Sequence, residues 1–100
     1  MNKQYLVFIN IPPALEGLMV DNLLMLEFER GFCGFPIYAH HHENKGLSII
    51  EQVTGRQKRI QFQIYVDGMN LALLLANLRE NFSGTKIQYW VTPVFDSGVF

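Results

Sequence analysis

The sequence of 100 residues is poor in cysteine and in charge, and it has no long hydrophobic run. Its single cysteine, Cys33, excludes an intrachain disulfide and excludes zinc or copper sites of the CxxC type. No apolar stretch approaches the ~20 residues that a membrane helix needs, and no basic stretch followed by a long apolar run marks a secretory signal. We therefore expect a cytoplasmic protein that is not embedded in a membrane.

Charge is balanced as well as scarce. The sequence has eight Lys and Arg residues and nine Asp and Glu residues, so its net charge is −1. A general binder of polyanions carries a strong basic excess, so we expect no nucleic-acid partner. With 49% hydrophobic and only 17% charged residues, the chain is not expected to be disordered. Its length is that of one domain, which we place over residues 1–100.

Hydrophobic periodicity predicts four strands and two helices. The clearest strand is residues 56–67, where apolar and polar residues alternate strictly. Asp67 is a good N-cap for the helix that follows, and Gly84 a good residue to end it. The other strands are expected at residues 5–10, 32–42 and 86–92, the last closed by Pro93, and the first helix at residues 14–28, before Gly31. The order β-α-β-β-α-β is the ferredoxin-like plan, an α+β fold with an antiparallel sheet and two helices on one face.

That plan leaves the second face of the sheet bare. The face would show Gln61, Gln63 and Tyr65 beside apolar residues of the first strand. The first helix is also apolar beyond one narrow stripe, which indicates a further surface to cover. A half-apolar sheet face needs a partner, and the two glutamines should then pair with each other or with backbone, because buried amides need hydrogen bonds.

Several short motifs carry a resemblance to a known family. They are Gly31-Phe32-Cys33-Gly34-Phe35-Pro36, Ser83-Gly84-Thr85-Lys86-Ile87, and the stretches 12–16 (PPALE), 51–56 (EQVTGR) and 89–94 (YWVTPV). With them, the whole chain resembles the PII-like family of small trimeric regulators, which includes PII signalling proteins and CutA. It is most similar to a branch of unknown function whose members are often encoded beside heavy-metal efflux pumps. The resemblance implies a homotrimeric regulator that is not an enzyme, with a membrane efflux pump as a partner.

The segment that corresponds to the phosphate-binding loop of PII is short. PII proteins bind ATP partly through an extended glycine-rich loop, whereas this chain has only residues 83–86, with one glycine. Cradling a phosphate needs several backbone N–H groups that converge on one anion. The long signalling loop of PII is likewise shortened here, to about residues 42–56. We therefore predict that ATP binding is weak or absent.

The sequence His40-His41-His42 is the sharpest candidate for chemistry. On a strand, His40 and His42 point to the same side, where two neutral imidazoles can share Zn, Cu, Ni or Co. Glu43 could add an oxygen ligand. The alternative is a solvated strand end with three incidental histidines. A divalent transition metal is thus the candidate cofactor.

Basic residues and the cysteine give weaker signals. Arg56, Lys58 and Arg59 cluster at the exit of the 42–56 loop, and Lys86 lies beside the second short loop. They could meet a phosphate or an acidic partner surface, or they could simply be solvated strand-edge residues. Cys33 is expected to be buried and inert.

Two interpretations remain open at this stage. In the first, a PII-like trimer binds a small ligand or metal and reports to a partner through its loop. In the second, the chain is a metal-binding or buffering module without a signalling role. An enzyme is the weakest hypothesis, because the sequence offers no paired acid and base.

Overall fold

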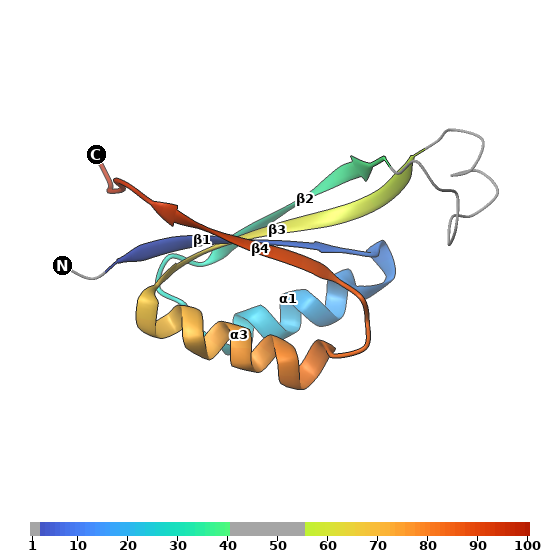
Figure 1. The fold of residues 1–100 in the computed structure, drawn as a ribbon, viewed down its shortest axis with the longest axis horizontal. Helices are drawn as coiled ribbons and strands as arrows, with labels where there is room; N and C mark the ends of the chain where they lie inside the picture. Colours follow the sequence, from blue (N-terminus) through green and yellow to red (C-terminus); the bar gives the residue numbers. More distant parts are fainter. Residues whose placement is uncertain (1–2, 41–55) are drawn as a thin grey trace.

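The structure, a computed structural model, describes residues 3–40 and 56–100. The elements follow the order β1 (Gln4–Ile11), a short 3-10 helix (Pro13–Leu15), α1 (Glu16–Met25), β2 (Phe32–Ala39), β3 (Gln57–Asp67), α3 (Gly68–Phe82) and β4 (Gln88–Val94). The strands form one antiparallel sheet in the order β2-β3-β1-β4, and both helices lie on the same face of it (Figure 1). The predicted α+β, ferredoxin-like fold is confirmed.

The core lies between the sheet and the two helices. Alternate residues of the two central strands point toward the helices, as the period of two requires. Met19 and Leu23 of α1 pack against these residues, and so do Leu74 and Leu78 of α3 on the same face of the sheet. The strand residues of this core are Val7, Ile9, Ile11, Ile60, Phe62, Ile64 and Val66. A hydrogen bond of 2.7 Å from the Asn22 amide to the Asn77 side-chain oxygen ties the helices together.

The ends of the helices agree with the sequence in part. Asp67 caps α3, because its Oδ1 accepts a hydrogen bond of 2.8 Å from the Asn70 backbone N–H. Gly84 follows the helix with a φ of 83°, the left-handed conformation that favours glycine. The first helix was expected to extend to residue 28, but α1 ends at Met25. Glu27 adopts a φ of 52° before Gly31 is reached, so the chain leaves the helix earlier than the glycine indicates.

Pro93 does not close the last strand, contrary to the prediction. β4 continues through it to Val94, and Pro93 lies opposite Tyr5 of β1. The reason is topological. β4 is an edge strand. The outer N–H groups of an edge strand have no hydrogen-bond acceptor on a neighbouring strand, so a proline, which lacks an N–H, can be accommodated there.

In the described part of the chain, no helix is both long and apolar enough to cross a membrane. The first helix nevertheless exposes apolar side chains, as its sequence predicted. Leu18, Leu24 and Met25 are all largely exposed, whereas Met19 and Leu23 are buried. The helix thus has more apolar surface than this domain covers.

Candidate functional site

None of the helices and strands in residues 3–40 and 56–100 covers the sheet face opposite the helices. We call it the open face. The register assigns to it the residues whose neighbours in sequence point into the core, namely Leu6, Phe8, Asn10, Cys33, Phe35, Ile37, Arg59, Gln61, Gln63, Tyr65, Trp90 and Thr92. Phe35 and Trp90 remain 37% and 41% exposed. Phe8 and Trp90 stack with their ring centroids 5.4 Å apart. The predicted bare, half-apolar face is therefore present.

A row of side-chain amides crosses the middle of the open face. The Gln63 amide donates to Gln61 Oε1 at 3.2 Å, and the Gln61 amide donates to Asn10 Oδ1 at 3.0 Å. The expectation that Gln61 and Gln63 pair with each other is confirmed. The two hydrogen bonds within one chain satisfy part of the hydrogen-bonding capacity of these amides, which lowers the cost of removing water from the face.

Cys33 is exposed, and the expectation of a buried cysteine is wrong for the single chain. The residue lies opposite Gln63 in the register, so its side chain points to the open face. Successive residues of a strand point to opposite faces, so Cys33 points outward because Phe32 points toward the core. The thiol would lose its exposure only if another surface covered this face.

Three connections meet at one end of the domain, which we call the loop end. β1 finishes there, β3 and β4 begin there, and so the turn into α1, the connection between β2 and β3 and the turn from α3 into β4 lie at the same end (Figure 1). The two ends of the described chain lie at the opposite end of the sheet. Of the site residues that the sequence predicted, His40, Arg56, Lys58 and Lys86 are described, and they fall at the loop end.

Of the two histidines predicted to bind a metal, the structure describes His40. The strand expected at residues 32–42 is shorter than predicted, because β2 ends at Ala39 and His40 follows it as an exposed residue outside the strand. His42 and Glu43 lie outside the described residues. Among residues 3–40 and 56–100, no group of three or more His, Cys, Asp and Glu side chains is placed to hold a metal ion. A metal bound by His40 would thus need ligands from the 41–55 segment or from another molecule.

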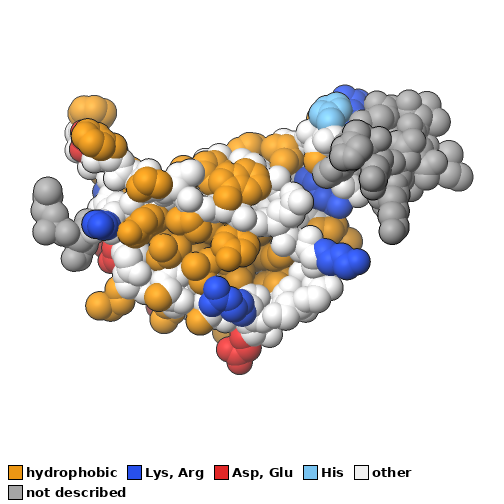
Figure 2. Space-filling view, viewed as in Figure 1, with side chains coloured by type: hydrophobic (Ala, Val, Ile, Leu, Met, Phe, Trp, Pro, Cys, Tyr) orange, Lys and Arg blue, Asp and Glu red, His pale blue; other side chains and the backbone are white. Residues whose placement is uncertain are grey.

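The three basic residues at the start of β3 do not form one cluster. Arg59 lies opposite Ile37 and shares the open face, whereas Lys58 lies opposite Tyr38 on the other face. The Arg56 guanidinium carbon stands 4.1 Å from the centroid of the Tyr38 ring, close enough for a cation–π interaction. Figure 2 shows basic side chains and a histidine at this end of the molecule. Arg56 is thus positioned by an aromatic ring that the sequence interpretation did not assign to the site.

Lys86 belongs to a tight turn between α3 and β4. Its backbone φ is 59°, a value that residues other than glycine seldom adopt, and it lies two residues after Gly84. The Thr85 hydroxyl donates to the Phe82 carbonyl at 2.6 Å, and the Thr85 N–H bonds the same oxygen at 3.3 Å. The turn therefore uses one of its few backbone donors for itself.

Sequence reasoning missed the partners of the residues that it selected. Asn10 terminates the amide row, Tyr38 holds Arg56, and Trp90 stacks on Phe8. Asn10 could have been found, because it shares the alternation of Leu6 and Phe8. The pairs with Tyr38 and Trp90 depend on the register between strands, which a single sequence does not give.

Comparison with known proteins agrees with this geometry. The family model described as "Protein of unknown function (DUF3240)" matches residues 1–100. A crystal structure of a DUF3240 family protein from Shewanella baltica is similar with a TM-score of 0.79 and 23% identity, covering 100% of this chain and 99% of that one. No curated protein matches the chain.

Two further solved structures are similar in fold. CutA from Synechococcus elongatus, complexed with Bis-Tris, has a TM-score of 0.72 and 12% identity, with 99% of this chain and 87% of that one covered. CPII from Thiomonas intermedia, a nitrogen regulatory PII-like protein bound to ADP, AMP and bicarbonate, has a TM-score of 0.66 and 14% identity, with 94% and 91% covered. At such identities the likeness shows the fold alone.

Proposed function

Because this chain belongs to the DUF3240 family and has the fold of PII and CutA proteins, we propose that it is a PII-like regulatory protein that works as a homotrimer. The observation that carries the proposal is the open face. A sheet that buries one side in its own core and leaves stacked aromatic rings on the other is typical of a subunit that packs on its neighbours. The regulator would act in the cytoplasm and would not be an enzyme.

The chemistry of the open face suits three sheets that face one another. Leu6, Phe8, Phe35 and Trp90 supply apolar area, and its burial stabilises an assembly by roughly 25 cal/mol per Å². The amide row carries no charge, so its burial does not need a counter-ion. Arg59 lies toward the loop end of the face, where it can keep its guanidinium at the rim of the assembly.

A single charge on this face tests the assembly. In Trp90→Glu the carboxylate would stand where the indole stacks on Phe8, and burying an unpaired charge is strongly unfavourable. Sedimentation equilibrium should give the mass of one chain for this variant and of three chains for the wild type. Leu73→Glu is the matched control, because Leu73 is 51% exposed on α3, in the layer of the molecule away from the open face. A Trp90→Glu protein that stays trimeric would contradict the proposal.

The ligand of the regulator would bind at the loop end, and the 41–55 segment would report its presence to a partner, for which a membrane efflux pump is the candidate. His40, His42 and Glu43 would hold a divalent transition metal, and Arg56, Lys58 and Lys86 would bind an anionic ligand or an acidic partner surface. Three features support this. His40 is exposed, Arg56 is held in place by Tyr38, and the three connections lie at one end of the sheet. The PII-like neighbour that binds nucleotides and bicarbonate shows that this fold can serve ligand binding.

Titration with Zn²⁺, Ni²⁺ and Co²⁺ tests the metal. Binding should weaken on acidification, because protonated imidazole cannot act as a ligand. His40→Ala and His42→Ala should each weaken it strongly. Absence of binding to the wild type would contradict the metal site. Metal binding that leaves the affinity for a pump domain unchanged would favour a buffering module without a signalling role.

A further inference from the structure

A pocket lies between α3 and the edge strand β4, on the helix side of the sheet. Its volume is about 240 Å³. Leu75, Leu78, Phe82, Ile87 and Tyr89 form its apolar walls, and Arg79, Lys86, Ser83 and Gly84 complete its lining. Figure 2 shows hydrophobic side chains gathered along the hollow between α3 and β4, with basic side chains at its border. The pocket is therefore separate from the open face, and among the residues proposed above for the loop end it shares only Lys86.

The apolar floor of the pocket and the turn at one end of it are both fixed by contacts within the domain. Leu78 and Phe82 are 8% exposed and belong to the core, so the floor does not depend on mobile surface residues. The turn that closes one end is fixed by the Ser83 hydroxyl, which donates to the Arg79 carbonyl, and by the Thr85 hydroxyl, which donates to the Phe82 carbonyl. A cavity held in this way is largely formed before a ligand arrives.

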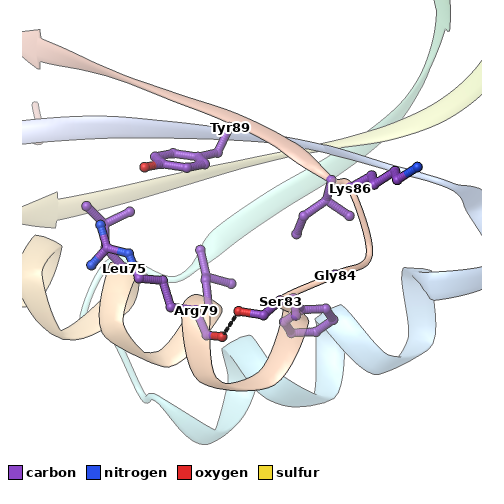
Figure 3. Close-up of a pocket in the computed structure, with 9 residues that line it drawn as sticks. Leu75, Arg79, Ser83, Gly84, Lys86 and Tyr89 are labelled. Carbon is purple, nitrogen blue, oxygen red and sulfur yellow. Dashed lines mark hydrogen bonds between the residues drawn. The ribbon is translucent and has the colours of Figure 1, made fainter.

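The polar groups of the pocket favour an anion. It is lined by two cations and by no acidic residue. Within residues 3–40 and 56–100, the Arg79 guanidinium has no side-chain hydrogen bond or ion pair. In Figure 3 the Arg79 guanidinium and the Tyr89 hydroxyl extend toward the same end of the pocket, while the Lys86 ammonium points away from it. One end can therefore supply two donors to a single carboxylate.

We propose that this pocket binds a small amphipathic carboxylate, with an aromatic or branched aliphatic body. The body would replace water against Leu75, Leu78 and Tyr89, and the carboxylate would accept hydrogen bonds from Arg79 and the Tyr89 hydroxyl. A nucleotide does not suit the site, because the volume lies below the 300–1,000 Å³ typical of pockets for larger ligands. This inference requires neither a trimer nor a metal, so its test is independent of the proposed function.

Benzoate and hexanoate are the probes, and benzyl alcohol and hexanol are their uncharged counterparts. Backbone amide NMR spectra should show saturable shifts confined to residues 75–89, with dissociation constants of about 0.1–1 mM for the carboxylates. The alcohols should bind at least tenfold more weakly. Shifts spread over the whole chain, or alcohols that bind as well as the acids, would overturn the proposal.

The variant Arg79→Gln tests how much the charge of Arg79 contributes to benzoate binding. Arg79 is exposed, so the variant should fold, as its amide spectrum would show. It should bind benzoate about tenfold more weakly, which corresponds to about 1.4 kcal/mol, and should bind benzyl alcohol as before. Lys3→Gln is the matched control, since it also removes one exposed positive charge but lies at the opposite end of the sheet. Equal affinity of the two variants for benzoate would overturn the role of Arg79.

Discussion

Gly34 is a position at which one methyl group should disturb the core. It lies opposite Phe62 in the register between β2 and β3, and the Phe62 ring covers it. A Cβ built on Gly34 would stand 2.8 Å and 2.9 Å from two carbons of that ring. Phe62 is 2% exposed, and its ring packs edge-on against Phe32 with 6.0 Å between centroids. The ring therefore cannot move aside without disturbing a second, partly buried ring.

The magnitude follows from two opposing effects. Overpacking of a filled core costs about 1–3 kcal/mol. Replacing glycine by alanine also restricts the unfolded chain, which stabilises the fold by about 0.4–1 kcal/mol where the new side chain fits. The clash should win at this site, so we expect Gly34→Ala to lower the free energy of unfolding by about 1–2 kcal/mol. For a domain of this size that is a fall in Tm of roughly 4–15 °C.

Urea unfolding at one fixed protein concentration is the assay, since assembly makes apparent stability depend on concentration. Gly17→Ala in α1 is the control, because a Cβ there would meet no atom within 4 Å and should stabilise the helix by about 0.5–1 kcal/mol. Phe62→Leu should reduce the effect of Gly34→Ala in a double-mutant cycle. A Gly34→Ala protein as stable as the wild type would refute the reasoning.

Two further predictions concern a helix cap and a nucleotide. Asp67→Ala removes the side chain that caps α3, and the free energy of unfolding should fall by about 1 kcal/mol in the same urea assay; no loss would mean that water replaces the cap fully. ATP should bind weakly or not at all, because the 83–86 turn has one glycine and spends its Thr85 N–H on Phe82. Calorimetry that gives a dissociation constant near 1 µM, about −8 kcal/mol, would contradict that prediction.

The fold could be predicted from the sequence because its local signals agree with one another. Strict alternation from Ile60 to Val66 fixes which side of β3 is buried, and Asp67 and Gly84 mark the two ends of α3. Where the prediction was wrong, tertiary structure decided the outcome. β4 continues through Pro93 only because that strand is at the edge of the sheet. Glu27, just after the end of α1, has a positive φ that its residue type does not indicate.

The candidate site was less predictable than the fold. Chemistry-bearing residues such as His40 and Arg56 stand out in a sequence, but what they contact depends on register and on crossings between strands. Arg59 was grouped with Lys58 by proximity in sequence, and the pleat places them on opposite faces. The pocket at Arg79 and Tyr89 unites a helix and a strand whose meeting point no short motif encodes.

The central claim is that this chain works as a trimer built on its open face, and the mass of the wild-type protein in solution tests it most directly. Sedimentation equilibrium at micromolar concentration should give three times the 11.5 kDa mass of one chain. The fluorescence of the single tryptophan, Trp90, should shift to longer wavelength when dilution separates the subunits, because its ring would pass from the interface into water. A stable species with the mass of one chain at that concentration would contradict the account.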